Sequence, residues 1–514
     1  MALAACGGGE KAAGGGNVGS LTATTGYPEP HTMFAPGGGG GGPGFTGSKV
    51  LERLARYNRD QTFSPVLAES WSIAPDHRSV TLNLRSNVTW HDGKPFTSED
   101  VVWTIKAYWK PFFPQTILDF LAGVEATGPL GVVVRFDRPV PEFSVGYLLS
   151  DGANYILPKH LYAGTDLLLN PVNNAPVGTG PWKFSQWVRG SHAEFVKNPT
   201  YWIPGQPKLD KLIVRWWREP ASRAAAFETG QLDIGVHNPA PLGDLKRLQA
   251  NPQLSVSFED QGAPLGLHFN TRNPVVSDPR VRRALLHAVD RDFISRTVYY
   301  GYAKPAAGPI LTSNRLYFDP DIPKYPFDPA LADRLLTEAG YPRRAGAERF
   351  KLNLLASGWS EENGKSGAYL KQAFEDLGIA TTLRVPDRAN SLKALYTDYD
   401  FDVAYSQGGG TYNDPIPDLP LVFGTAGIKK GLIFRNSARY SNPELDAIFD
   451  QIKQEVDPAR RKAETLNAAR IILRDAPIVP LVEWPTHIIQ KTSVKIASNA
   501  ASIATDSWGD ISKS

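Results

Sequence analysis

Two patterns of apolar and polar residues follow each other in the first quarter of the chain. Along Ser79–Arg85 apolar and polar residues alternate, which is the period of a half-buried strand. Val101, Ile105 and Tyr108 follow at spacings of four and three, so they share one face of a helix. Thr97 precedes this helical pattern and supplies a capping oxygen. The stretch therefore predicts a strand followed by a capped, amphipathic helix.

The second half of the chain alternates between short apolar runs and helical patterns. Four helices are predicted to begin at an Asp-Pro or Asn-Pro pair, because the first residue can cap and proline fits the first helical position. Strands alternating with helices are typical of an α/β fold. The predicted strands and helix starts are Leu265–Asn270, Lys351–Leu355, Thr381–Val385, Phe401–Tyr405, Ile478–Leu481, Ile488–Ile489, Asp278, Asp328, Asn442 and Asp457.

Glycine interrupts these patterns near the start of the chain. Residues 1–19 include the run CGGGEKAAGGGNVG and predict a flexible tether. Residues 37–44 read GGGGGGPG, a composition that favours neither helix nor central strand, so we expect a loop there. Ser48–Tyr57 follows with apolar residues on one face and predicts a short helix.

Length and charge narrow the class of protein. The 514 residues are enough for two or three domains, and 42% hydrophobic with 21% charged residues is ordinary for a globular protein. The net charge of +3 gives no argument for nucleic acid or an anionic membrane surface as a partner. No window approaches the roughly 18 uninterrupted apolar residues that predict a membrane-spanning helix.

The single cysteine, Cys6, excludes disulfide frameworks and thiolate zinc sites. Its context, Leu3-Ala4-Ala5-Cys6-Gly7, resembles a bacterial lipobox, in which the cysteine is lipidated. The charged and apolar regions of a signal peptide do not precede it, as expected for a chain given without its leader. The alternative is a chance cysteine in a disordered tail. We predict lipidation of Cys6.

Three ordered stretches carry a family resemblance. They read PVLAESW with WHDGKPFTSEDV between residues 65 and 101, GTGPWKF with NPTYW between 178 and 202, and FNTRNPVVSDPRVRRALLHAVDRD at 269–292. This set is similar to the bacterial extracellular solute-binding proteins, family 5, which are the dipeptide-, oligopeptide- and nickel-type receptors of ABC importers. Many positions match in order, so the resemblance is specific.

The resemblance implies a fold and a division into domains. The fold is α/β, namely the two-lobed periplasmic-binding-protein fold (type II-like, cluster C) with an extra subdomain inserted in lobe one. Because composition shows no linker, the boundaries are taken from the family. We expect a tether at 1–19, lobe one at 20–263 plus 486–514 with the inserted subdomain at about 46–174, and lobe two at 264–485. The chain would cross between lobes near 263–271 and 479–486.

The resemblance also implies a function. We expect an extracytoplasmic receptor, periplasmic or at the cell surface, that binds a solute between hinged lobes and presents it to a membrane permease. A peptide or peptide-like solute is the predicted ligand, and an oligosaccharide, opine or other non-peptide solute is the alternative. We expect a monomer that needs no cofactor, touches the membrane only through its N-terminal lipid, and binds no nucleic acid.

The residues themselves offer little chemistry that would make an enzyme. The nine histidines are scattered, and neither H-E-x-x-H nor the G-x-S-x-G elbow of hydrolases occurs. Glu361 and Glu362 are consecutive and point to different faces of a helix, whereas glycosidase carboxylates converge from separate elements. We therefore expect no catalytic residues and no metal site. A secreted hydrolase and a sensor that has lost transport are the alternatives.

Phe401–Leu421 is the most informative stretch for the ligand. In the family, a loop after a strand of lobe two pairs with an extended peptide and holds its α-ammonium group through a carboxylate. Alignment on Asn413-Asp414-Pro415 places Thr411 at that carboxylate position. A buried ammonium without a carboxylate loses a hydrogen bond of about 1.5–3 kcal/mol, which weakens recognition of a free peptide N-terminus. Tyr412 or Asp414 could compensate.

Aromatic residues at predicted strand ends extend the candidate site. Trp359 follows a strand end at Gly358, and Trp484 lies beside a predicted crossing; packing in the core is the alternative for both. The complete set of predicted ligand-binding residues is Tyr27, His268, Asn270, Trp359, Tyr405, Gly409, Thr411, Tyr412, Asn413, Asp414 and Trp484.

Overall fold

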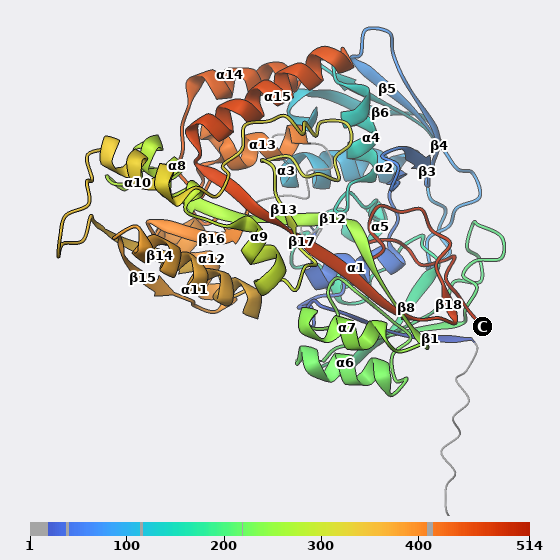
Figure 1. Ribbon diagram of the computed structural model, residues 1–514. Helices are drawn as coiled ribbons and strands as arrows, with labels where there is room; N and C mark the ends of the chain where they lie inside the picture. The colour runs from blue at the N-terminus through green and yellow to red at the C-terminus, as the bar shows by residue number, and fades with distance from the viewer. Residues whose placement is uncertain (1–18, 37–40, 114–116, 218, 409–414) are drawn as a thin grey trace, which may run out of the picture.

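The computed structural model describes residues 19–36, 41–113, 117–217, 219–408 and 415–514. Its main feature is a sheet that has eleven strands in these ranges. Two of these strands are long and run through the middle of the molecule (Figure 1). In spatial order the strands are β15 (Ala380–Arg384), β14 (Lys351–Ala356), β16 (Val403–Gln407), β12 (Leu254–Phe269), β17 (Ile478–Lys491), β11 (Ile234–Val236), β1 (Ser20–Thr25), β10 (Lys211–Arg215), β9 (His192–Lys197) and β8 (Trp182–Val188), and β13 (Lys304–Pro305) pairs with β17.

The two long strands divide this sheet into two halves. β12 and β17 are antiparallel, β12 also pairs with β16, and β17 also pairs with β11. We call the part built on β11, β1, β10, β9 and β8 the first lobe, and the part built on β16, β14 and β15 the second lobe. Within each lobe some neighbouring strands are parallel, as β1 with β11 and β14 with β16. Parallel strands need a long crossover connection between them, and helices lie in these connections.

The sequence patterns underestimated these long strands. Residues 265–270, 478–481 and 488–489 were predicted as short strands, whereas β12 has 16 residues and β17 has 14. Pro264 and Pro485 interrupt the hydrophobic pattern, and proline cannot donate a ladder hydrogen bond. The hydrogen-bonded ladder between β12 and β17 contains two register shifts, between Glu259 and Ala263 and between Leu265 and Gly266.

Helix starts in the second lobe agree with the prediction. The side chains of Asp278, Asp328, Asn442 and Asp457 each accept a main-chain N–H of the first turn, and proline occupies the next position. The helices that they begin are α8 (Pro279–His287), α10 (Pro329–Glu338), α14 (Pro443–Ile452) and α15 (Pro458–Asp475). Their apolar faces cover the second half of the sheet and each other.

A separate four-stranded antiparallel sheet joins the first lobe. Its order is β4 (Ala68–Ile73), β5 (Ser79–Leu84), β7 (Gly131–Phe136) and β6 (Leu121–Gly128). The predicted helix follows β5 as α2 (Ser98–Thr104), which continues as a π-helical turn, η1 (Ile105–Trp109). Val101, Ile105 and Tyr108 are fully buried in the core of this sheet, as their spacing predicted.

The glycine-rich segment is the clearest error of the sequence prediction. Helix α1 spans Gly41–Val50, so it includes half of the expected loop, whereas the expected helix at 48–57 ends early and gives way to β2 (Ala55–Tyr57). Packing overrides intrinsic propensity here. Phe45 is buried in the first-lobe core, and a Cβ on Gly42 would meet the main-chain oxygen of Pro28 at 3.0 Å. A side chain at position 42 would require its neighbours Pro28 and Pro30 to move by a few tenths of an ångström.

Candidate functional site

One cavity of about 990 Å³ lies between the two lobes. Tyr27 follows β1 and His237 follows β11, while Trp359 follows β14 and Gln407 ends β16, and all four side chains line the cavity. Ligands of open α/β sheets bind outside the carboxyl ends of the strands. The cavity therefore lies where the strand ends of both lobes meet, and its volume suits a small organic ligand, for which about 300–1,000 Å³ is usual.

The first lobe contributes a strained floor. His237 and Asn238 both have left-handed backbone conformations, with φ of 55° and 59°. Such residues cost about 1–3 kcal/mol each and persist where the surroundings hold them. Glycine at position 26 lets the main chain after β1 lie close against that of His237, because a Cβ on residue 26 would lie 2.0 Å from the main-chain oxygen of His237. The ring of Tyr27 stacks on the His237 ring at 3.8 Å.

Strand β17 holds this floor in place. Asn238 donates its main-chain N–H to the main-chain oxygen of His487 at 3.1 Å. The side-chain oxygen of Asn238 accepts the main-chain N–H of His487 at 2.8 Å. The His487 ring is fully buried, and neither ring nitrogen has a hydrogen-bond partner of normal geometry. Burial lowers the pKa of His487 to about 3 and of His237 to about 4, although the nearby main chain of Ala240 opposes the shift at His487. Both imidazoles are therefore neutral near pH 7.

One carboxyl group on the cavity wall has an unusual pKa. Glu259, on β12, accepts the main-chain N–H of Ile503 at 2.7 Å. Burial raises its pKa to about 7, against the lowering effects of that hydrogen bond and of Arg59. Burial raises the pKa of Tyr27, and the charge of this carboxyl group raises it further. Perturbed acids on a cavity wall are common at functional sites.

The second lobe contributes an apolar and cationic wall. The guanidinium of Arg388 lies 4.3 Å over the Trp359 ring, and that ring contacts the ring of Phe434 at 5.8 Å. Phe434 has a left-handed φ of 56°, which is rare for a bulky side chain. The preceding residues, Leu432 and Ile433, line the cavity and remain 48% and 45% exposed. This wall can cover an apolar group of a ligand.

Three of the predicted ligand-binding residues line the cavity. Tyr27 stacks on His237, Trp359 lies under Arg388, and Trp484 lies on β17 opposite Ala263, another lining residue. They come from the first lobe, the second lobe and a central strand, so the fold brings together positions far apart in the sequence.

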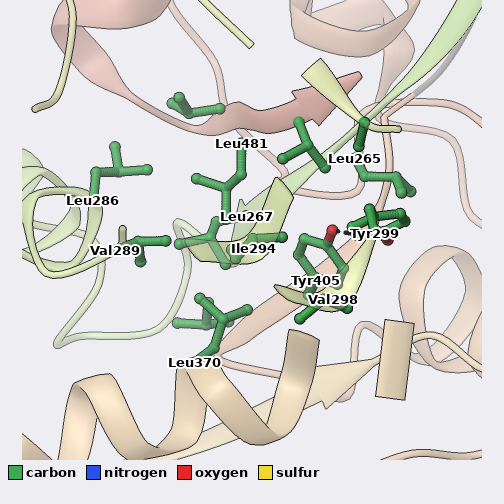
Figure 2. Packing of buried hydrophobic residues seen from close by; sticks show 14 of the residues in the cluster. Leu265, Leu267, Leu286, Val289, Ile294, Val298, Tyr299, Leu370, Tyr405 and Leu481 are labelled. Carbon is green, nitrogen blue, oxygen red and sulfur yellow. Dashed lines mark hydrogen bonds between the residues drawn. The ribbon is translucent and has the colours of Figure 1, made fainter. Parts of the chain in front are cut away.

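Three others lie away from the cavity wall. His268 is buried and hydrogen-bonded to Ser437 Oγ at 2.8 Å, because β12 points it into the second lobe. Asn270 comes directly after the end of β12 and donates its side-chain N–H to the main-chain oxygen of Phe401, just before β16, at 3.0 Å. Tyr405 is fully buried in the hydrophobic core, where its hydroxyl group contacts that of Tyr299 at 3.2 Å (Figure 2). Their contacts serve the packing of the second lobe.

The remaining predictions concern positions outside the described residues. Gly409, Thr411, Tyr412, Asn413 and Asp414 belong to this group, and so does Cys6. The strand that leads to the first five is β16, whose last residue, Gln407, lines the cavity.

Sequence reasoning missed the residues with the most unusual geometry. His237-Asn238-Pro239 follows a short strand, and Asn-Pro is a turn signal that could have drawn attention to it. Leu432–Phe434 is an apolar run in a loop, which is a weaker signal. Arg388 and His487 carry no sequence signal, because an arginine or histidine in the cavity looks the same in sequence as one elsewhere.

No helix in the described ranges is both long and apolar enough to cross a membrane. No group of three or more His, Cys, Asp or Glu side chains in them is arranged to hold a metal ion.

Two lobes joined by crossing strands, with a cavity between them, define the class of two-lobed solute-binding proteins. The family described as bacterial extracellular solute-binding proteins, family 5 Middle, matches residues 62–430. This match spans more than half of the chain, so the chain belongs to that family.

Relatives and solved structures agree with this assignment. A probable di/tripeptide-binding protein 5 of Pseudomonas aeruginosa is 27% identical over 479 residues, covering 87% of this chain and 86% of that protein. NikA of Brucella suis in complex with Fe(III)-EDTA has a TM-score of 0.83 at 24% identity, covering 96% and 100% of the two chains. AppA of Bacillus subtilis with a nonapeptide has a TM-score of 0.81 at 21% identity, covering 96% and 99%. The two-lobed α/β fold predicted from the sequence is confirmed.

Proposed function

We propose that this chain is the receptor of an ABC importer and that its solute is a peptide or peptide-like molecule. The observation that carries the proposal is the cavity of about 990 Å³ that both lobes line at the carboxyl ends of their strands. The family membership supports solute capture, and the relative named as a di/tripeptide-binding protein supports a peptide. Aromatic, apolar and charged residues all line this cavity, a mixture that is usual for sites that bind small organic ligands.

The proposal extends to the way in which the receptor works. The boundaries expected from the sequence, near residues 263 and 486, lie on β12 and β17, which supports a hinge at these two strands. Closure around the solute would bring both lobes to a membrane permease. We further propose a non-catalytic monomer anchored by a lipid on Cys6, with the lipobox-like context as its support.

A ligand screen tests the proposed function. The protein is first unfolded and refolded to remove carried ligand, and its melting temperature is then measured with degenerate di- to pentapeptides, opine-type acids and neutral oligosaccharides. Binding stabilises the folded state by about 2.7 kcal/mol at a ligand concentration 100 times Kd, so a clear rise is expected with peptides. A rise with oligosaccharides alone would contradict the peptide proposal.

The same screen addresses Thr411. If this residue has replaced the carboxylate that holds a peptide amine, N-acetylated peptides should raise the melting temperature as much as free-amine peptides do. A strong preference for the free amine would show that another group compensates.

A further inference from the structure

Lysine side chains gather at the end of the first lobe where β1 begins. One row across β8, β9, β10 and β1 consists of the direct neighbours Lys183, Val196, Lys211 and Ser20. Residues directly opposite each other in neighbouring strands point to the same face of a sheet. The side chains of Lys183 and Lys211 therefore flank that of Val196, which is 39% exposed. Lys211 pairs with Glu194 at 2.7 Å.

The last described segment brings further lysines to the same end. Lys513, in β19 (Ser512–Lys513), donates to the main-chain oxygen of Ser20 at 3.3 Å and to the carboxylate of Asp233 at 3.0 Å. Lys491, at the end of β17, donates to the other oxygen of that carboxylate at 2.8 Å. Two lysines from the C-terminal part of the chain are therefore fixed beside the first residue of β1.

One strand and two connections complete the cluster. β18 (Val494–Lys495) pairs with β19 and ends in an exposed lysine. The exposed Lys208 donates its main-chain N–H to the oxygen of Gly509 at 3.3 Å, and Lys197 donates its main-chain N–H to the oxygen of Asp210 at 2.9 Å. Figure 1 shows β1, β8, β18 and the C-terminus close together at this end of the first lobe.

These lysines hold the surplus positive charge of the chain. We call them the basic end, and its members are Lys183, Lys197, Lys208, Lys211, Lys491, Lys495 and Lys513. The carboxylates that pair with these lysines or lie beside them are Glu194, Asp210, Asp233 and Asp510. Seven lysines against four carboxylates leave a surplus of three, which equals the net charge of +3 of the whole chain. The near balance over the whole chain hides this cluster, because strand pairing gathers its lysines from separate segments.

The basic end and the cavity lie at opposite ends of the same strands. β1 begins in the basic end and has six residues, and Tyr27, which follows it, lines the cavity. β11 likewise begins after Asp233 and leads to His237 on the cavity floor. Six strand residues span about 20 Å. No lysine of the basic end lines the cavity, so the cluster is separate from the solute site.

We propose that the basic end binds the anionic headgroups of a lipid bilayer. In the described part of the chain its ion pairs involve only Lys211, Lys491 and Lys513, which leaves its other four lysines as unpaired cations. All seven cations are lysines, whose compact charge on a flexible stem needs no fixed partner geometry. Mobile headgroups offer charge without such geometry, and juxtamembrane lysines are attracted to anionic leaflets.

The position of the basic end along the chain favours a bilayer over a soluble partner. Cys6, for which we propose a lipid, lies thirteen residues before Gly19, and thirteen residues span at most about 45 Å. A lipid there would keep the basic end near the bilayer surface, and a lipid chain together with a basic patch anchors a protein more firmly than either alone. The first lobe would then hold the cavity about 20 Å above the headgroups, with or without solute.

Vesicle sedimentation tests this proposal on the full chain without a lipid. Sucrose-loaded vesicles contain phosphatidylglycerol and phosphatidylcholine in equal amounts, or phosphatidylcholine alone, and bound protein is measured in the pellet. Binding should require phosphatidylglycerol at about 0.1 M salt and be lost at about 1 M salt, because the Debye length falls from about 10 to about 3 Å. Soluble poly-glutamate at the same concentration of charge forms a further arm.

Two triple variants carry the same change of charge. The first replaces three unpaired lysines of the basic end by glutamine: K183Q, K208Q and K495Q. The control replaces three exposed lysines of the second lobe: K324Q, K351Q and K462Q. Each lysine near an anionic surface changes the binding constant about 5-fold, so the first variant should bind vesicles about 100-fold more weakly. The control should lose no more than about 3-fold, and both variants should melt and bind solute as the wild type does.

Each contrary result overturns the proposal. Equal sedimentation with and without phosphatidylglycerol would exclude headgroup charge as the cause of binding. Equal losses in the two variants would show that net charge, and not the basic end, attracts the vesicles. Tighter binding to poly-glutamate than to vesicles would assign the basic end to an acidic polymer instead of a bilayer. None of these results bears on solute capture, which the ligand screen measures without vesicles.

Discussion

Glu259 shows how a single side chain can make solute capture depend on pH. Its pKa of about 7 means that the carboxyl group is partly protonated under ordinary conditions. The group lies on the cavity wall near Tyr27, so its ionisation adds negative charge where the ligand binds. A bound anion raises the cost of that ionisation, and ligand binding is therefore linked to proton uptake.

For a carboxylate ligand, affinity should fall as pH rises from 6 to 8. Ionised Glu259 repels the ligand, and the protonated form below pH 7 does not, so a loss of roughly 3- to 10-fold is expected. Isothermal titration of one bound peptide across this range measures the effect. Glu259→Gln removes the titrating group and should give a flat profile. An affinity that rises with pH in the wild type would contradict the prediction.

At the residue scale, the sequence pointed to cavity residues where a predicted strand end or a predicted crossing between lobes marked the position. Trp359 was proposed because it follows the predicted strand that became β14, and it lines the cavity. Tyr405 lies within a strand, where side chains alternate between faces, and sequence alone could not assign its face. Arg388 became visible only when tertiary packing placed it against Trp359.

At the scale of elements, capping chemistry was local enough to predict and long strand pairing was not. The Asp-Pro and Asn-Pro starts depend on neighbours within four residues, and all four helices begin there. The length of β12 and β17 depends on their mutual pairing over most of their length, which no local pattern encodes. Helix α1 likewise forms because the core covers its glycine-rich face.

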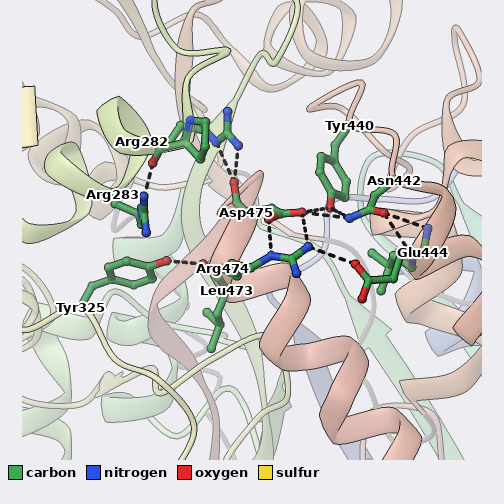
Figure 3. Close-up of polar contacts among 11 residues, drawn as sticks. Arg282, Arg283, Tyr325, Tyr440, Asn442, Glu444, Leu473, Arg474 and Asp475 are labelled. Atoms are coloured by element: carbon green, nitrogen blue, oxygen red, sulfur yellow. Dashed lines mark hydrogen bonds and ion pairs between the residues drawn. The ribbon is translucent and has the colours of Figure 1, made fainter. Parts of the chain in front are cut away.

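Asp475 illustrates how the ends of such elements are joined. It is the last residue of α15, and its carboxylate accepts hydrogen bonds from Tyr440 and Asn442 and pairs with Arg474 at 2.8 Å (Figure 3). Its main-chain oxygen accepts the Arg282 Nε–H from α8 at 2.9 Å. One residue therefore ties the end of α15 to α8 and to the segment that begins α14.

Asp475→Ala should destabilise the second lobe by about 1–3 kcal/mol, because Asn442 and Tyr440 lose a charged acceptor. Burial raises the pKa of Asp475, but the hydrogen bonds from Arg474, Tyr440 and Asn442 outweigh it and hold this pKa below its usual range. The stabilisation is therefore present at neutral pH and is lost as pH falls through the lowered pKa. Urea midpoints at pH 7 and pH 3 measure both effects.

A matched substitution controls for the loss of a surface carboxylate. Asp450 lies on α14, is 77% exposed at its side chain and approaches Lys453 only to 3.6 Å. Asp450→Ala should change the midpoint little, within about 0.5 kcal/mol. Equal effects of the two substitutions, or an effect of Asp475→Ala that persists undiminished at pH 3, would show that the network does not act as a unit.

At the scale of the whole molecule, the two lobes also touch through side chains that do not belong to the crossing strands. Arg461 of α15 donates to Ser144 Oγ at 2.6 Å, and Ser144 lies on α4 (Glu142–Ser150), which packs on the four-stranded sheet of the first lobe. Arg461 is 3% exposed and also donates to the hydroxyl group of Tyr317 at 2.9 Å within the second lobe. Opening of the lobes about β12 and β17 would separate Arg461 from Ser144.

Ser144→Ala should therefore shift the equilibrium towards the open arrangement. The closed arrangement loses roughly 1 kcal/mol, and ligand affinity should fall about 5-fold because binding must supply that difference. Small-angle scattering should show a larger radius of gyration at subsaturating ligand. Ser277→Ala is the control, because its hydroxyl group donates to the main-chain oxygen of Pro274 in its own lobe. If both variants bind and scatter as the wild type does, the Arg461–Ser144 contact does not contribute to closure, and contacts to the ligand must supply the whole of it.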